Sequence, residues 1–425
     1  MKKSLLASSL LLLSILIGSC QTSKKQTSNS QLFVYTSGSQ IIEPNGNPII
    51  LKGTNLGNWL VPEGYMFKSG KASSPTKINQ LIYQMIGPDS LKKFWDEYLD
   101  NYITREDIFY LKRIGANHIR LPFHYKLFTQ DEYMGDRNQG FKYFDRIIKW
   151  SKEADIYVLF DMHCAPGGQT GDNIDDSEGY PFLFQSDISK DEMVRIWVEI
   201  AKRYKDEPIV LGYDLLNEPI AHYFKEDYDK LKPELFPLYK RTIEEIRKVD
   251  PDHMIFLNGA EWSGDFSIFT DFSFPNIVYE FHKYWFSVNQ DAIQFYVDFS
   301  KKHNVPIYIG ETGENTDEWV MDFRTLLDKN EISWAFWPYK KMNNKSGIMN
   351  FTQPETYHLI TAFGDSSRYM FADVRKYRPD VNLVKKALNE FIENSKFKNN
   401  FPNEGYVNGL GFELMKPDEM MYDKR

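Results

Sequence analysis

The feature that most constrains the fold of this chain is a regular alternation of short apolar runs with longer amphipathic stretches. Eight runs are typical of buried strands: 49–56, 117–121, 156–162, 210–216, 254–257, 277–281, 306–310 and 333–337. Between them, apolar residues recur at intervals of three and four, as in helices, at 104–114, 141–153, 190–204, 238–249 and 318–327. Alternating strands and helices predict a parallel sheet covered by helices. Because eight strands close a barrel, we predict an α/β protein with a (β/α)8 TIM-barrel fold.

Segments outside this alternation predict how the barrel is closed. Residues 32–50 hold two β-rich runs on either side of a turn-forming segment at 44–48, so we expect a hairpin at the bottom of the barrel. Residues 343–380 look like a long irregular connection, which indicates a rim loop or lid. A last helix is expected near 384–392, in a C-terminal extension over 381–425. The sequence does not predict where 399–425 lies, and we treat 32–425 as one domain with enlarged loops at the carboxyl face.

The amino end has the pattern of an export signal. Lys2 and Lys3 precede an apolar run over 5–17, which is short for a membrane-spanning helix, so we interpret 1–19 as a signal peptide. The run ends at Cys20 in a segment that resembles a bacterial lipobox. This implies lipidation of Cys20 and an exported protein anchored to the bacterial cell envelope, at a periplasmic or surface face. Ordinary secretory cleavage followed by a spare cysteine is the alternative.

Residues 20–31 after the predicted signal are rich in Ser, Thr, Lys and Gln, which predicts a flexible tether. Besides Cys20 the chain holds only Cys164, so the mature protein has no pair for an intramolecular disulfide. Cys164 follows His163 and could be a thiol nucleophile, but small buried packing residues are commoner at strand ends. We interpret Cys164 as structural.

Two of the predicted strands end in a carboxylate. The run 210–216 leads to Asn217, Glu218 and Pro219, and the run 306–310 leads to Glu311. Carboxyl groups at the carboxyl ends of two parallel strands could flank one glycosidic bond, one as proton donor and the other as nucleophile or base. The alternative for either residue alone is a helix N-cap or a solvated loop carboxylate.

Other polar residues also gather at strand ends, where a packed core does not need them. They are Asn58, Trp59, Arg120, His163, Asn217, His282, Tyr284 and Trp337. All of them fall at the end of the barrel that carries active sites in this fold. Singly, Arg120 could be a structural ion-pair partner, and either histidine could be a satisfied core residue. Their joint placement favours a functional site.

This set of residues resembles glycoside hydrolase family 5 of clan A, whose pattern is Arg, His, Asn-Glu-Pro, His-x-Tyr, Glu and Trp on successive strands. The resemblance covers about 50–340. It implies Glu218 as acid/base and Glu311 as nucleophile in a retaining double displacement, with Asn217 holding the 2-hydroxyl of the sugar. It places Arg120 and Tyr284 beside Glu311, His163 and His282 near sugar hydroxyls or the carboxylates, and Trp337 under the sugar ring.

Within that family, segments 53–63 and 161–169 are similar to those of exo-β-1,3-glucanases, in which the residue corresponding to Glu63 grips hydroxyls of the terminal sugar. The resemblance implies a retaining β-glycosidase acting on β-glucans or β-glucosides, without a cofactor and as a monomer. Pro62, Gly64 and the segment 337–340 differ from the residues that the family usually has at these positions. An endo-acting β-1,4-glucanase or β-mannanase of the same family is an alternative, and a non-catalytic glycan-binding lipoprotein is one from another class.

Composition separates further function classes. The net charge of -8 and the lack of a basic stripe argue against nucleic acid. Of the many aromatic residues, Trp59, Tyr65, Trp262 and Trp285 follow strands and are candidates for further sugar contacts or for rim packing.

The acidic loop 167–179 could bind calcium but lacks EF-hand spacing, and acidic loops are usually just solvated. A metal-dependent hydrolase could use His163 and His282, although no His-x-His follows the first strand. We predict no metal.

Overall fold

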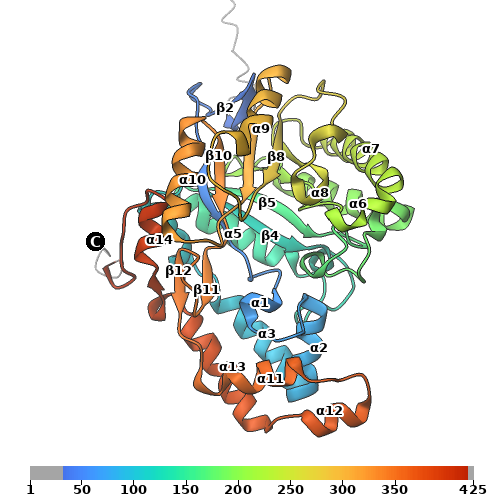
Figure 1. Cartoon of the computed structure of the whole chain (residues 1–425), viewed down its shortest axis with the longest axis vertical. Coiled ribbons are helices and arrows are strands. Elements are labelled where there is room, and N and C mark those ends of the chain that lie inside the picture. The colour runs from blue at the N-terminus through green and yellow to red at the C-terminus, as the bar shows by residue number, and fades with distance from the viewer. Residues whose placement is uncertain (1–31, 420–425) are drawn as a thin grey trace, which may run out of the picture.

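The computed structural model describes residues 32–419, and its centre is a closed barrel of parallel strands (Figure 1). The strands are β3 (Lys52–Asn55), β4 (His118–His124), β5 (Tyr157–Cys164), β6 (Val210–Asp214), β7 (Met254–Asn258), β8 (Ile277–His282), β9 (Ile307–Glu311) and β10 (Ser333–Phe336). Each strand pairs with the next in the chain, and β10 closes the ring on β3 with Trp334 opposite Lys52. The predicted TIM barrel and its eight strands are confirmed.

Helices surround this barrel. They are α4 (Arg105–Ile114), α5 (Gly140–Ala154), α6 (Asp187–Tyr204), α7 (Tyr228–Arg247), α9 (Asp291–His303) and α10 (Asp317–Lys329). All except α9 were predicted; exposed Phe295 interrupts the apolar period of α9. Local sequence sets the ends of α4, which starts at a capping box of Thr104 and Asp107 and stops at Gly115, whose φ of 116° suits glycine.

A hairpin covers the amino end of the barrel, as predicted. It consists of β1 (Tyr35–Ser37) and β2 (Gln40–Ile42), and its Val34 and Ile41 belong to the apolar cluster that fills this end of the barrel. The predicted turn at 44–48 is present, with Ile42 paired antiparallel to Pro48, and a second reversal that was not predicted lies at Gly38 and Ser39. Gly38 has a φ of 58°, which glycine tolerates. Residues 43–48 form a separate turn, closed by the Glu43 amide donating to the Asn47 carbonyl at 2.8 Å.

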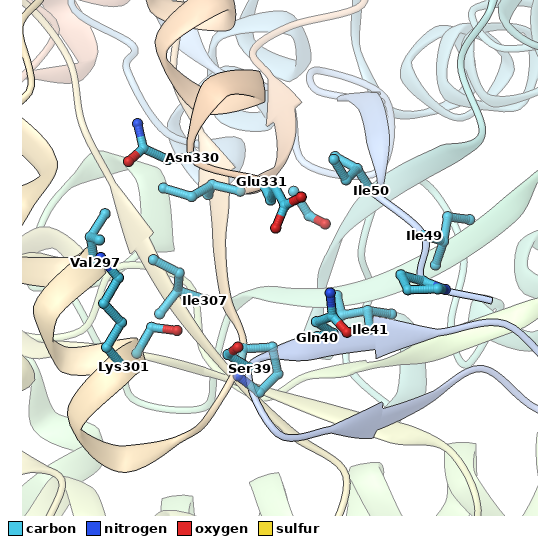
Figure 2. A pocket seen from close by; sticks show the side chains of 15 residues that line it. Ser39, Gln40, Ile41, Ile49, Ile50, Val297, Lys301, Ile307, Asn330 and Glu331 are labelled. Atoms are coloured by element: carbon cyan, nitrogen blue, oxygen red, sulfur yellow. The ribbon is translucent and has the colours of Figure 1, made fainter. Parts of the chain in front are cut away.

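A cavity of about 370 Å³ lies between this hairpin and the amino ends of β9 and β10 (Figure 2). Ser39, Gln40 and Ile41 line one side of it, and Ile307 and Glu331 lie on the barrel side. It is at the opposite end of the barrel from the strand ends that carry Glu218 and Glu311.

A helical layer lies beside the barrel, in the lower part of Figure 1. It combines α1 (Gly64–Phe67), α2 (Pro75–Ile86) and α3 (Pro88–Asn101) with α11 (His358–Asp365), α12 (Phe371–Tyr377) and α13 (Val381–Ser395). The prediction of an irregular loop over 343–380 was wrong, since the segment holds α11, α12 and a strand. Its elements are too short to show a clear period, yet Tyr357, Ile360 and Phe363 are buried.

The C-terminal segment, which the sequence left unplaced, packs against the barrel helices. A small sheet joins β11 (Lys340–Met342), β12 (Met349–Phe351) and β13 (Phe401–Pro402), and α14 (Glu404–Gly409) lies along α10. Beyond it, the ring of Phe412 lies 5.7 Å from that of Trp334. Within residues 32–419, no helix has both the length and the apolar character needed to cross a membrane. The predicted signal peptide, the tether and Cys20 lie outside the described residues.

Candidate active site

The carboxyl ends of the strands surround a pocket of about 550 Å³. Its lining consists of Glu63, Tyr65, His163, Ile174, Glu218, His222, Trp262, His282, Lys283, Tyr284, Trp285, Glu311, Glu314 and Trp337. Most of the predicted site residues are therefore brought together. Arg120 and Asn217 do not line the pocket and instead lie beneath it, bonded to its floor.

Glu218 and Glu311 approach each other closely across this pocket. One carboxylate oxygen of each lies within 4.8 Å of the other. Both residues are nearly buried, with 7% and 5% of their surface exposed. Glu218 has a φ of 44°, a left-handed conformation uncommon outside glycine, and the Thr170 hydroxyl donates to its carbonyl at 2.8 Å. The short separation suits direct nucleophilic attack and leaves no room for the water of an inverting mechanism.

Arg120 organises the floor of the site. Its Nη1 donates to Glu311 Oε1 at 2.7 Å, and its Nη2 donates to Asn217 Oδ1 at 2.9 Å. The guanidinium is fully buried, which is tolerated because carboxylates surround it, including Asp214 at 2.7 Å and Asp161 at 3.1 Å. Arg120 therefore fixes the positions of Glu311 and Asn217 together.

Sequence reasoning missed three buried acids around Arg120, namely Asp161, Asp214 and Glu280. A signal for two of them was present. Asp161 precedes His163 by two positions and Glu280 precedes His282 by two, so each acid points to the same side of its strand as the histidine. A charged residue inside an apolar strand, in register with a candidate site residue, indicates an inward-facing supporting group.

His282 lies between two carboxyl groups. Its Nδ1 is 2.9 Å from Glu218 Oε1, and its Nε2 is 3.1 Å from Glu280 Oε1. Burial lowers the pKa of His282 to about 3, so its ring is neutral, with one donor nitrogen and one acceptor nitrogen. The acceptor nitrogen needs a protonated carboxyl group as its partner. Glu218 or Glu280 must therefore carry a proton.

The surroundings of Glu218 and Glu311 differ. Burial raises the pKa of Glu218 to about 7. Burial also raises the pKa of Glu311, while the charge of Arg120 opposes that rise. The Tyr284 hydroxyl donates to Glu311 at 3.2 Å, which adds to the bond from Arg120. The site can thus hold Glu218 neutral while two donors stabilise the charge of Glu311.

Trp337 forms a flat wall of the pocket. Its ring is stacked on that of His163, with centroids 5.5 Å apart and planes inclined by 9°, and its indole N–H donates to the Tyr65 hydroxyl at 2.7 Å. Trp59, a predicted candidate for sugar contacts, is not in the pocket. It is fully buried, donates to the Leu99 carbonyl and packs edge-on against Tyr143, so it is a core residue.

Trp262 reaches the opposite wall from an unusual turn after β7. Glu261, Trp262 and Ser263 have φ values of 55°, 59° and 65°. Left-handed geometry costs about 1–2 kcal/mol for each such residue. Lys232 pairs with both Glu261 and Asp265 and helps to hold the turn. The Trp262 indole donates to His222 Nδ1 at 2.9 Å.

Glu63 lies at the β3 side of the pocket and is almost completely buried. Its backbone N–H donates to Asn58 Oδ1 at 2.9 Å. Its Oε1 has no hydrogen-bond partner within residues 32–419. Burial, followed by the charges of Glu311 and Glu314, raises the pKa of Glu63 well above its ordinary value. A buried carboxyl oxygen that faces a pocket without a partner suits binding of a ligand hydroxyl.

Carboxylates of the acidic loop 167–179 accept hydrogen bonds from the loop itself and from neighbouring segments. Asp175 accepts from the backbone of Thr170 and Gly171, and Asp176 accepts from Thr76. Two groups in residues 32–419 have the spacing to hold a metal ion, the set Asp161, His163 and Glu311 and the set Glu218, His282 and Glu311. A metal there would compete with the hydrogen bonds that both His282 nitrogens and His163 Nδ1 already make.

A closed barrel that presents two such carboxyl groups at this spacing defines a retaining glycosidase. Comparison with known families makes the assignment more specific. Residues 77–343 match the family described as Cellulase (glycosyl hydrolase family 5), and the chain belongs to this family.

Proteins similar to this sequence carry the names of a xylosidase, an endoglucanase and a glucosidase. A "Beta-xylosidase" of Phanerodontia chrysosporium is 28% identical over 373 residues, covering 78% of this chain and 75% of the relative. "Endoglucanase C" of Acetivibrio thermocellus is 25% identical over 313 residues, covering 59% and 88%. "Probable glucan 1,3-beta-glucosidase A" of Aspergillus fumigatus is 27% identical over 289 residues, covering 63% and 66%.

Solved structures share the fold. An endogalactoceramidase superposes with a TM-score of 0.57 at 16% identity, covering 89% of this chain and 84% of that one. A rutinosidase from Aspergillus niger gives a TM-score of 0.55 at 19% identity, covering 69% and 91%. At these identities the likeness shows a common barrel and nothing about the substrate.

Proposed function

We propose that the protein is an exo-acting β-glycosidase that releases a terminal glucose from β-glucans or β-glucosides, with Glu218 as acid/base and Glu311 as nucleophile. The observation that carries the exo mode is Glu63. Its buried carboxyl group faces the pocket from the β3 side, and its Oε1 has no hydrogen-bond partner in the part of the chain that the structure describes. A terminal sugar can supply the missing hydroxyl partner. The similarity to a relative named as a glucan 1,3-beta-glucosidase supports glucose as the sugar.

In the first step of the proposed mechanism, a Glu311 oxygen attacks the anomeric carbon from the face opposite the leaving group. The bond from that carbon to the leaving oxygen breaks, and the leaving oxygen takes the proton of Glu218. Asn217 donates from Nδ2 to the sugar 2-hydroxyl, because its Oδ1 is already occupied by Arg120. The product of this step is a glycosyl ester on Glu311.

In the second step, Glu218 accepts a proton from water while the water oxygen attacks the anomeric carbon. The ester bond breaks, and Glu311 leaves as a carboxylate, which Arg120 and Tyr284 stabilise. Two inversions give net retention of the β configuration. Glu218 ends the cycle protonated, as it began.

Product profiling of the domain without residues 1–31 tests the exo mode. Laminarin, lichenan, cellulose, mannan and aryl β-glucosides are incubated with enzyme, and the products are resolved at early times. We expect glucose to appear first, from laminarin or from a glucoside. Mixed oligosaccharides at the earliest times would instead mean an open, endo-acting cleft.

The endo-acting alternatives keep the same two carboxyl groups and differ in the substrate that the pocket accepts. Early release of cello- or manno-oligosaccharides would identify a β-1,4-glucanase or a β-mannanase. The similarity to an endoglucanase makes the first of these the one to test directly. Aryl β-xylosides belong in the same panel because of the β-xylosidase relative.

We also propose that the enzyme is exported and held at the cell envelope through a lipid on Cys20. The apolar run over 5–17 and the cysteine placed after it support this proposal. Cells that express the full chain are fed a labelled fatty acid, and a Cys20→Ala variant is the control. We expect label only in the chain that retains Cys20; label in both chains, or in neither, would contradict lipidation at this residue.

A further inference from the structure

One wall of the pocket contains an ion pair that the mechanism above does not use. Lys341 Nζ lies 2.7 Å and 2.8 Å from the two carboxylate oxygens of Glu314. The side chain of Lys341 is 2% exposed and lies behind Glu314, which lines the pocket. The Ser346 hydroxyl accepts a further bond from Lys341 at 3.2 Å. A buried cation with two bonds to one carboxylate fixes that carboxylate in position and charge.

This ion pair is connected to the aromatic wall. The Tyr65 hydroxyl donates to Glu314 Oε1 at 3.4 Å and accepts from the Trp337 indole N–H at 2.7 Å. Lys341 also lies over the Tyr65 ring, 5.3 Å from its centroid. Glu314 thus belongs to one continuous set of contacts that ends at the ring of Trp337.

The order of strands places this wall on the sugar side of the bond to be cleaved. In the ring, β10 and β3 lie opposite β6 and β7. Glu218 follows β6, and the proton donor must lie beside the leaving group. Glu63 and Tyr65 follow β3, and Trp337 follows β10, so they face Glu218 across the pocket. Glu314 contacts Tyr65 and lies at this remote side.

Glu314 and Glu63 offer complementary hydrogen-bonding groups at that side. Burial raises the pKa of Glu314 and Lys341 opposes that rise, whereas burial and the neighbouring carboxylates both raise the pKa of Glu63. An ionised carboxylate accepts hydrogen bonds only, and a protonated one also donates. Together they suit the hydroxyl groups of a sugar that has no further residue attached.

We propose that Glu314 is a specificity-determining residue that accepts hydrogen bonds from free hydroxyl groups at the non-reducing end of the terminal sugar, and that Lys341 is the residue that positions it. This inference rests on the proposed exo-acting function and adds to it the carboxylate that recognises the non-reducing end of the substrate. The ligand class is an unsubstituted terminal hexopyranose. A chain extended through those hydroxyls would have no hydroxyl group to donate to Glu314 and would lose that contact.

Steady-state kinetics on three aryl β-glucosides test the proposal: the parent compound, its 4-deoxy analogue and its 6-deoxy analogue. The variants are Glu314→Gln, Lys341→Met and the double variant, which leaves no unpaired buried charge. In each variant we expect KM for the parent glucoside to rise about tenfold and kcat to change less than threefold. A contact that is equally strong in the ground state and the transition state affects KM and leaves kcat nearly unchanged. On at least one deoxy analogue, wild type and variants should have the same KM.

Two controls separate positioning from general damage. Lys248→Met removes an exposed partner of Glu245 on α7 and should leave every KM unchanged. Lys341→Arg retains the charge and should restore most of the parent KM, with thermal unfolding recorded for all variants. Variants that lose activity equally on all three glucosides would overturn the inference. If the wild-type enzyme releases no monosaccharide, the exo-acting function itself is contradicted. If the wild-type enzyme releases monosaccharide but the variants keep its KM for the parent glucoside, only the role of Glu314 is contradicted.

Discussion

Glu218 and Glu311 reach one pocket from strands on different sides of the barrel, and their neighbours give them different tasks. Glu311 lies against a buried guanidinium and a tyrosine hydroxyl, which favour its charged form. Among residues 32–419, only His282 hydrogen-bonds to the carboxyl group of Glu218, and burial raises the pKa of Glu218 to about 7. This separation of two neighbouring carboxyl groups is the physical basis for one acid and one nucleophile.

Azide distinguishes the two roles by stereochemistry. Glu311→Ala should abolish turnover of an aryl β-glucoside, and azide should restore it with a glycosyl azide of inverted configuration. Glu218→Ala should lower kcat by roughly 10²–10⁴, the usual contribution of a general acid, and azide should give the retained configuration. NMR of the azide products checks both outcomes, and an exchange of the two stereochemical results would reverse the assignment.

The pKa of Glu218 predicts both an activity profile and a stability profile. Activity should fall as pH rises through about 7, because the leaving group then lacks a proton donor. The raised pKa also means that the folded state holds a proton that the unfolded chain releases above about 4.3, so this stabilisation is lost as pH rises through about 7.

Glu218→Gln checks this reasoning with two measurements. With an activated aryl leaving group, which needs no proton, the variant should lose the alkaline fall in rate. In thermal or urea unfolding above pH 7 it should be more stable than wild type, by on the order of 3 kcal/mol. Equal unfolding of both proteins across pH 5–8 would show that Glu218 titrates normally.

At the scale of elements, the turn after β7 shows how backbone strain serves the pocket. Three successive residues with positive φ are tolerated because Lys232 pairs with Glu261 and also with Asp265, one within the positive-φ run and one just after it. The turn places Trp262 opposite Trp337, on the side where the leaving group must lie. No sequence pattern predicts this geometry, since none of the three residues is glycine.

Removal of the Trp262 indole should weaken binding on the leaving-group side. Trp262→Ala should raise KM for laminari-oligosaccharides about five- to tenfold, in line with roughly 1 kcal/mol for an aromatic contact, with little change in kcat. Tyr369→Ala is the matched control, because Tyr369 is 96% exposed and lies outside the pocket lining. An unchanged KM in Trp262→Ala would show that the ring only packs the rim.

The elements also show what the sequence could predict. The strands and most barrel helices follow from local apolar periods. Strand ends then led to Arg120, His163, Asn217, Glu218, His282, Tyr284, Glu311 and Trp337, whereas Glu63 came from the resemblance to exo-β-1,3-glucanases; the structure places all of these residues in or beneath one pocket. Trp59 was a candidate that is a core residue instead, since side-chain direction after a strand is not a local property. Of the helical layer, the sequence predicted only the last helix, α13. The helices α11 and α12 were missed because they are short, and burial in this segment depends on partners hundreds of positions away, such as Tyr357 donating to the Phe67 carbonyl.

At the scale of the whole molecule, the C-terminal segment ties distant parts of the barrel together. The Glu413 amide donates to the Ile114 carbonyl at 2.7 Å, and Arg324 donates to the Gly409 carbonyl at 3.3 Å. The Tyr406 hydroxyl donates to the carbonyl of Trp337, so the segment also supports the pocket wall from behind.

Truncation after Asn400 should therefore destabilise the protein. It removes buried Tyr406, Val407, Leu410 and Phe412, each worth about 1.5–3 kcal/mol of apolar burial. We expect the unfolding temperature to fall by roughly 10 °C or more, measured by calorimetry. Truncation after Glu419 removes only 420–425 and is the control, which should unfold as the full domain does. A chain ending at Asn400 with the unfolding temperature of the control would show that the segment adds nothing to stability.

The hairpin of β1 and β2 has a further consequence for how the enzyme meets its substrate. It seals the amino end of the barrel, and the chain enters the described structure at this end, with β2 at the top of Figure 1 and α1 near the carboxyl end. Anything that holds the protein by its amino end therefore turns the pocket outward. If the proposed lipid on Cys20 holds the protein at a membrane, polymer ends diffusing in from the medium would reach Trp337 and Glu218 without passing that surface.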